Sequence, residues 1–74
     1  MGILFRSGNW WIRVNGDEHP PVHCHVIHPD GDALIYLSGK TLSRRVPQGV
    51  MQTAWAWVVQ HEEDVRKEWS RLND

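Results

Sequence analysis

Four of the five histidines lie within ten residues, and they are the first candidates for chemistry. The segment reads HPPVHCHVIH and places imidazoles at His19, His23, His25 and His28. Imidazole can bind a transition metal, and it can also accept or release a proton near neutral pH. This segment is therefore the candidate functional surface of the chain.

A β-strand that starts near Val22 would bring two of these histidines together. The two prolines before it cannot donate hydrogen bonds to a sheet, so the strand should begin after them. Side chains alternate between the faces of a strand, so Cys24 should face the core while His23 and His25 project from the opposite face. Both imidazoles can then reach one metal ion, one phosphate or one substrate.

Three interpretations of this pair remain open. In the first, His23 and His25 bind a divalent transition metal together with His19 and leave a coordination position free. In the second, they are the acid and base of a small toxin-type ribonuclease, with Arg13 or Arg44 steadying the phosphate of RNA. In the third, they are half-exposed polar residues on the solvent face of an antiparallel sheet.

The same segment resembles the domain-of-unknown-function 4160 family of short bacterial proteins, whose signature reads HxPPHxH. The matching residues are His19, Pro21, His23 and His25, while Val22 stands where the pattern has its second proline. The resemblance covers nearly the whole chain and implies a strand-rich first half followed by a C-terminal helix. It also implies a partner, because members often look like one half of a pair encoded side by side, similar to toxin and antitoxin pairs.

Length and composition limit the class of protein. The chain has 74 residues, which is one domain spanning 1–74. Its single cysteine, Cys24, excludes an internal disulfide, so the small core can be reinforced by a metal, by oligomerisation or by large apolar side chains, and five tryptophans supply the last kind. A net charge of -1 provides no overall field to attract nucleic acid or a membrane surface. No apolar run approaches the roughly 18 residues that span a membrane, and we expect a cytoplasmic protein.

Turn-forming residues divide the first half into short segments of β-strand character. These predict strands at about 3–6, 10–14, 22–28, 33–37 and, as a fifth, 41–45. Connections this short join antiparallel neighbours, which predicts a meander. Apolar residues at three- and four-residue steps predict a helix over about 47–72, with a bend expected near 60–63. The predicted fold class is α+β, with the sheet packed against a C-terminal helix or bent helix pair.

The tryptophans are the second candidate for binding. Trp10 and Trp11 are adjacent on a predicted strand and should point to opposite faces, so that one joins the core and the other meets a partner. Trp55 and Trp57 lie about 200° apart around a helix, which favours a homo-oligomer. The leading interpretation is a small binding or interaction module, one half of a toxin-antitoxin-like pair. Its candidate binding residues are His19, His23, His25, His28, Trp10 and Trp11.

Overall fold

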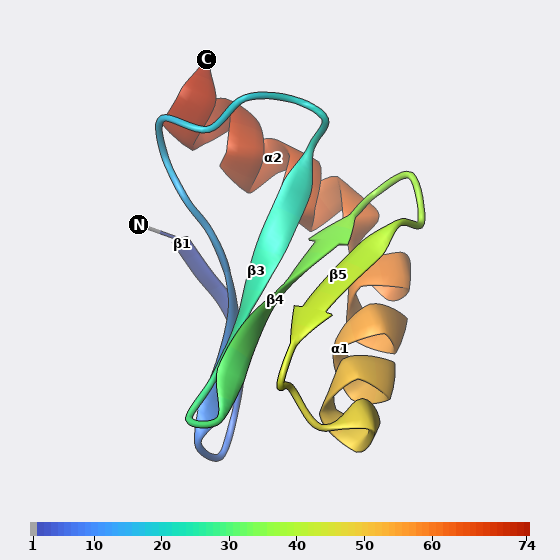
Figure 1. The fold of residues 1–74 in the computed structure, drawn as a ribbon. Coiled ribbons are helices and arrows are strands. Elements are labelled where there is room, and N and C mark those ends of the chain that lie inside the picture. The colour runs from blue at the N-terminus through green and yellow to red at the C-terminus, as the bar shows by residue number, and fades with distance from the viewer. Residues whose placement is uncertain (1) are drawn as a thin grey trace.

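The five strands follow one another both along the chain and across the sheet. The computed structural model describes residues 2–74, whose elements are β1 (Gly2–Ser7), β2 (Trp10–Val14), β3 (His23–His28), β4 (Gly31–Tyr36), β5 (Thr41–Arg44), α1 (Gln48–Gln60) and α2 (Glu62–Asn73). Each strand pairs antiparallel with the next, in the order β1-β2-β3-β4-β5 (Figure 1). The predicted meander and the α+β class are confirmed, and β3 begins one residue later than expected, at His23.

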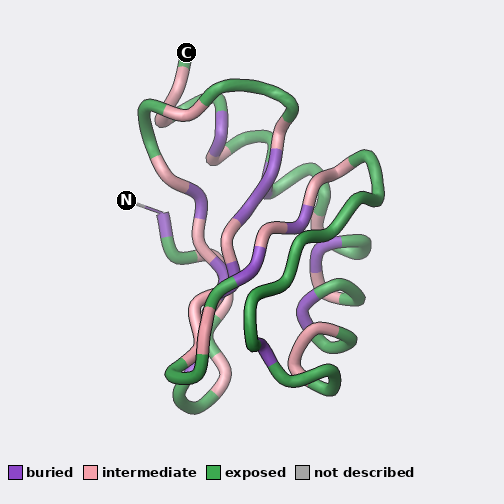
Figure 2. The backbone as a smooth tube through the Cα atoms, viewed as in Figure 1, coloured by how far each residue is buried: buried purple, intermediate pink, exposed green. Residues whose placement is uncertain are grey.

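Both helices lie on the same side of the sheet and leave its other face open (Figure 1). The alternation of buried and exposed residues along the strands follows from this arrangement (Figure 2). Ile12, Val26 and Ile35 from three neighbouring strands are fully buried, and Ala54 of α1 and Val65 of α2 meet them in the same core. The odd-numbered residues of β2 and β3, which include Arg13 and His25, therefore face the open side of the sheet.

A β-bulge in β1 changes which side chains face the helices. The pairing of β1 with β2 shifts between Ile3 and Phe5, so Leu4 is the extra residue. After the shift Phe5 packs against Trp57, with ring centroids 5.5 Å apart. Arg6 then lies on the open face of the sheet.

The C-terminal helix is broken at His61, within the expected interval. This residue ends α1 and begins α2, with a backbone φ of -129°. Its Nδ1–H donates to the carbonyl oxygen of Trp57 at 2.7 Å, and the two rings stack with centroids 4.3 Å apart. Three acidic residues in the first turn of α2 complement its dipole. Within residues 2–74, neither helix is long and apolar enough to cross a membrane.

The adjacent tryptophans of β2 do point to opposite faces. Trp10 is 6% exposed and belongs to the core, whereas Trp11 is half-buried on the open face. The guanidinium carbon of Arg6 lies 5.4 Å from the centroid of the Trp11 ring, which is a cation-π distance. On α1, Trp57 is half-buried against the sheet while Trp55 is exposed.

Candidate metal centre

The loop between β2 and β3 carries Glu18 to the start of β3. The peptide bond between Pro20 and Pro21 in this loop is cis. Asn73, at the end of α2, holds the loop from the other side. Its Oδ1 accepts a hydrogen bond from the backbone N–H of Glu18 at 2.8 Å, and its Nδ2–H donates to the carbonyl oxygen of Asn15 at 3.0 Å. The position of the Glu18 backbone is therefore fixed by a residue of the last helix.

His23 is enclosed by aromatic side chains. Its ring centroid lies 5.0 Å from that of Tyr36 and 5.1 Å from that of Trp69, and the residue is only 6% exposed. The interpretation that both histidines of the pair are half-exposed is therefore wrong for His23. The reason is that α2 and the loop before β3 reach over the end of the strand. His25, two residues further on, is half-buried.

Glu18, His23 and His25 bring three potential ligand atoms to one point. Within residues 2–74 these three residues form a group whose ligand atoms all lie within 4.8 Å of one another. Glu18 Oε1 lies 3.3 Å from His23 Nε2 and also contacts His25 Nε2. The two imidazole centroids are 5.3 Å apart. The alternation of the strand thus places both rings on one side, and the loop supplies a carboxylate between them.

A hydrogen bond to Pro21 determines which nitrogen of His23 carries a proton. The Nδ1 of His23 lies 2.8 Å from the carbonyl oxygen of Pro21, which can only accept, so Nδ1 must be the donor. In the neutral ring Nε2 then carries a lone pair, and this lone pair faces Glu18 Oε1, which is also an acceptor. Two acceptors at 3.3 Å need a cation between them, either a proton or a metal ion.

One of the two contacts of Glu18 has the separation of two ligands of one metal ion, whereas His25 Nε2 is hydrogen-bonded more closely to Oε1 and must move apart to bind the same ion. Two ligands at roughly 2.0–2.1 Å from a tetrahedral zinc ion are about 3.3 Å apart. Glu18 Oε1 and His23 Nε2 are also 3.3 Å apart. Two imidazoles and one carboxylate are also a donor set that zinc and other first-row divalent metals accept.

The charge state of Glu18 fits the same role. Burial alone raises the pKa of its carboxyl, but hydrogen bonds and positive charge from His25 and His23 outweigh burial, and the pKa lies below its usual 4.5. The carboxylate is thus ionised at neutral pH, which is the form that binds a metal.

The two outer histidines of the segment are not part of this group. His19, the expected third ligand, is exposed and lies outside the group. The third potential ligand atom comes from Glu18 instead. His28 lies at the far end of β3, where its Nδ1 accepts a hydrogen bond from the backbone N–H of Asp30 at 3.0 Å. The candidate binding segment therefore divides into one cluster and two separate histidines.

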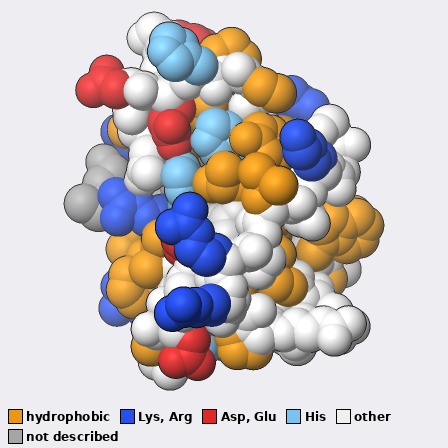
Figure 3. Space-filling model, in the orientation of Figure 1, with side chains coloured by type: hydrophobic (Ala, Val, Ile, Leu, Met, Phe, Trp, Pro, Cys, Tyr) orange, Lys and Arg blue, Asp and Glu red, His pale blue; other side chains and the backbone are white. Residues whose placement is uncertain are grey.

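Two of the predicted arginines lie on either side of His25. Arg13 on β2 is its direct partner across the strands. Arg44 on β5 and His25 line the same groove of about 460 Å³ on the open face. Figure 3 shows histidine, basic and hydrophobic side chains gathered on this face. The cluster is thus next to a surface that a ligand can reach.

The sequence offers Glu18 only as one of three nearby acids, with Asp17 and Asp30, and does not assign it as a ligand; Asn73 was missed altogether. Glu18 precedes His23 by five residues, and an acidic side chain in the loop before a histidine pair was the signal for a third ligand. Asn73 gave no such signal, because 55 residues separate it from the backbone N–H that it holds. Only the packing of α2 against the loop brings the two together.

The fold and the site together define a class: an α+β protein whose open-faced meander carries a Glu-His-His cluster at the start of its third strand. The family model described as domain of unknown function (DUF4160) matches residues 9–70, and the chain belongs to this family. No curated protein and no solved structure matches the chain. The description of the family names no activity, so the function is argued from the site.

Proposed function

We propose that the protein binds one divalent transition-metal ion through Glu18, His23 and His25. The observation that supports this proposal is the convergence of their ligand atoms within 4.8 Å. Three protein ligands complete neither a tetrahedral nor an octahedral shell, so water or another small ligand fills what remains. Such a site can polarise a bound group or lower the pKa of bound water.

The surroundings of the three residues also support the proposal. Histidines that bind metals usually donate their second ring N–H to a carbonyl or carboxylate, which fixes the tautomer and the ring orientation. His23 makes this contact with Pro21. Asn73 likewise fixes the backbone that carries Glu18. These contacts already hold the ligands in place, so the ligands lose less conformational freedom when the ion binds.

The same contacts argue against a role of His23 as acid or base in the ribonuclease interpretation. An acid or base in catalysis must bring a ring nitrogen within hydrogen-bond distance of the substrate. Both nitrogens of His23 are already engaged, one by Pro21 and one by Glu18, and the residue is 6% exposed. A metal ion replaces the proton between these groups without moving the ring into solvent.

A cobalt titration tests the proposal. Co²⁺ is added to tag-free, chelator-treated protein, and its visible d-d absorption reports the ligands and geometry; Zn²⁺ is then added as a competitor. Glu18→Gln and His25→Ala each remove one ligand. His19→Ala is the matched control, because His19 is a neighbouring histidine that lies outside the cluster.

We expect one cobalt ion per chain in the wild type and in His19→Ala, displaced by one equivalent of zinc. Loss of a hydrogen bond to a metal ligand typically costs 10–100-fold in metal affinity, so loss of the ligand itself should cost roughly 100-fold or more. Equal cobalt affinity in the wild type and in Glu18→Gln would overturn the proposal. So would a loss of binding in His19→Ala comparable to that in His25→Ala.

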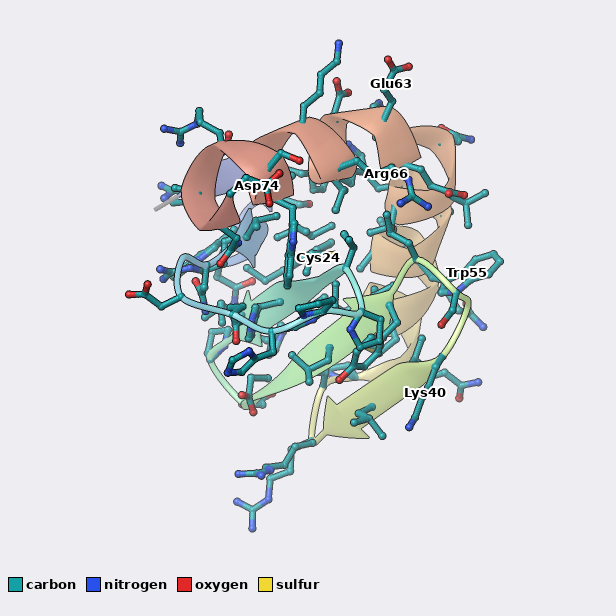
Figure 4. All side chains as sticks on the ribbon, turned by 90° about the horizontal axis from the view of Figure 1, so that it is seen from above. Cys24, Lys40, Trp55, Glu63, Arg66 and Asp74 are labelled. Carbon is teal, nitrogen blue, oxygen red and sulfur yellow. The ribbon has the colours of Figure 1, made fainter. Side chains whose placement is uncertain are left out.

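Assembly is a separate part of the expected function. A homo-oligomer, or a pair with a small protein encoded alongside, stays a prediction. Trp55 is 44% exposed and Val59 is 46% exposed, both on α1, and Figure 4 shows Trp55 projecting away from the sheet. The mass of the purified protein in solution, compared with that of Trp55→Ser, distinguishes a single chain from an oligomer that uses this side chain.

A further inference from the structure

Arg13 is half-buried, and its side chain has no partner among residues 2–74. It lies on the open face of the sheet, directly opposite His25. Its Nε is buried, and among residues 2–74 it has no hydrogen-bond partner; no salt bridge of Arg13 is found there either. The guanidinium of an arginine has five N–H donors in a fixed planar arrangement. The buried Nε–H without a partner is costly unless a ligand accepts a hydrogen bond from it.

Arg44 is a second arginine near His25, which lies between it and Arg13 on the open face. It is exposed on β5 and lines the groove of about 460 Å³ together with His25. Asp32 is its partner across the strands, but the salt bridges among residues 2–74 do not include this pair. The guanidinium of Arg44 is therefore available to a ligand in the groove.

The groove has an apolar side as well. Leu34 and Leu42 face each other across β4 and β5 and both line it, and Leu42 is 50% exposed. The indole Nε1 of Trp11, on the same face, is a further buried donor without a partner among the described residues. The open face next to His25 thus combines donors that are unpaired among residues 2–74, the positive charge of Arg44, the carboxylate of Asp32 and exposed apolar surface.

We propose that the ion held by Glu18, His23 and His25 binds an oxygen of a phosphate monoester, while Arg13 and Arg44 bind other oxygens of the same phosphate group. This inference rests on the proposed metal site and names the ligand of its open position. The planar fork of arginine matches phosphate oxygens, and it does so with two hydrogen bonds at once.

The number of donors selects phosphate over a carboxylate. A carboxylate has two oxygens, so it cannot give separate oxygens to a metal ion and to two guanidinium groups. A phosphate monoester has three terminal oxygens and satisfies all three. The organic part of the ester lies against Leu34 and Leu42, which gives an ester more contact than inorganic phosphate.

The test uses cobalt-loaded protein and follows its visible spectrum as anions are added. Phenyl phosphate and inorganic phosphate are titrated in parallel, with acetate as the carboxylate control. Arg13→Gln and Arg44→Gln each remove one guanidinium. Arg66→Gln is the matched control, because Arg66 is exposed on α2, on the opposite side of the sheet. Cobalt affinity is measured for every variant before any anion is added.

The expected order of affinity is phenyl phosphate, then inorganic phosphate, then acetate. Charge-assisted hydrogen bonds lead us to expect that Arg13→Gln and Arg44→Gln each weaken phenyl phosphate by roughly tenfold or more, with unchanged cobalt affinity. Arg66→Gln should bind as the wild type does. Arg44 is exposed, so its variant keeps the test valid even where Arg13→Gln fails to fold.

Four results would overturn the inference. Cobalt-loaded protein that binds no phosphate contradicts it while leaving the metal site intact. Equal phosphate affinity in the wild type and in Arg44→Gln contradicts it as well, and so does acetate that binds as tightly as phenyl phosphate. Protein that fails to bind cobalt at all contradicts the proposed metal site and the inference with it.

Discussion

Asn73 accepts a hydrogen bond from the backbone N–H of Glu18 at 2.8 Å and so ties the end of the chain to the loop before β3. The contact joins two residues 55 apart in sequence. It means that the position of a proposed metal ligand depends on the docking of α2. Folding of the last helix and assembly of the site are therefore coupled.

Replacing Asn73 tests this coupling. We expect Asn73→Ala to lower cobalt affinity about 10–100-fold, as the loss of a hydrogen bond that positions a ligand usually does, although no ligand is removed. Asn9→Ala, in the exposed turn between β1 and β2, is the control. Metal affinity is compared with the urea midpoint of each variant. An Asn73→Ala protein that binds cobalt as the wild type does would show that α2 plays no part in positioning Glu18.

Glu18 should make stability depend on pH in the absence of metal. The pKa of its carboxyl is lower in the folded protein than the usual 4.5, so it stabilises the fold above that pH, and the contribution disappears as pH falls through the lowered value. With a chelator present, the wild type should therefore lose more stability than Glu18→Gln as the pH is lowered below about 4.5.

Urea unfolding at a series of pH values measures this difference. Asp32→Asn is the control, because Asp32 is exposed on β4 and the salt bridges among residues 2–74 do not include it. It should follow the wild-type curve. Parallel curves for the wild type and Glu18→Gln would contradict the role assigned to the histidine contacts.

The fold could be predicted from local sequence because short turns and period-two alternation determine it. Asn15 with Gly16, and Asp30 with Gly31, mark strand ends that the structure confirms within a few residues. The bend at His61 was also expected from the thinning of the apolar pattern. These features depend on neighbours in sequence, so the sequence carries them directly.

The features that sequence missed arise from contacts between distant segments. The bulge at Leu4 shifts the register of β1 without any glycine or proline to mark it. His23 is buried because Trp69 packs over the end of β3, which the alternation of the strand cannot reveal. The pair His23 and His25 was predicted correctly as neighbours on one face, while their carboxylate partner was not assigned.

Cys24 should be unreactive in the folded protein. Burial raises the pKa of its thiol from 9.0 to about 12, and the residue is 0% exposed. The thiolate that attacks reagents is therefore scarce at pH 8. We expect an aromatic disulfide reagent to label the thiol only after unfolding in urea, whereas Ser38→Cys, at an exposed turn, should gain one fast-reacting thiol in the folded state.

The same pKa has a consequence for alkaline stability. The folded protein holds the thiol protonated while the unfolded chain loses the proton above about pH 9, so stability should fall as pH rises from 9 towards 12. In the labelling experiment described above, fast and stoichiometric reaction of Cys24 in the folded protein at pH 8 would contradict the buried position of this side chain.

Truncation of Ile35 should destabilise the protein strongly, whereas truncation of Ile3 should have little effect. Ile35 is 0% exposed beneath the helices, and Ile3 is 43% exposed on the open face. Truncation of a buried isoleucine costs about 2–5 kcal/mol, so Ile35→Ala should lower the melting temperature strongly or prevent folding. Ile3→Ala should change the free energy of unfolding by less than about 0.5 kcal/mol. Equal effects of the two substitutions would contradict the assignment of the helix-covered face.

The most direct test of the account is the metal content of the protein. Tag-free wild type and Glu18→Gln are incubated with a small excess of zinc, dialysed against metal-free buffer, and analysed for zinc and for protein concentration. The account predicts one zinc ion per chain in the wild type and a content near zero in Glu18→Gln. Wild-type protein without zinc, or equal zinc in both proteins, would contradict it.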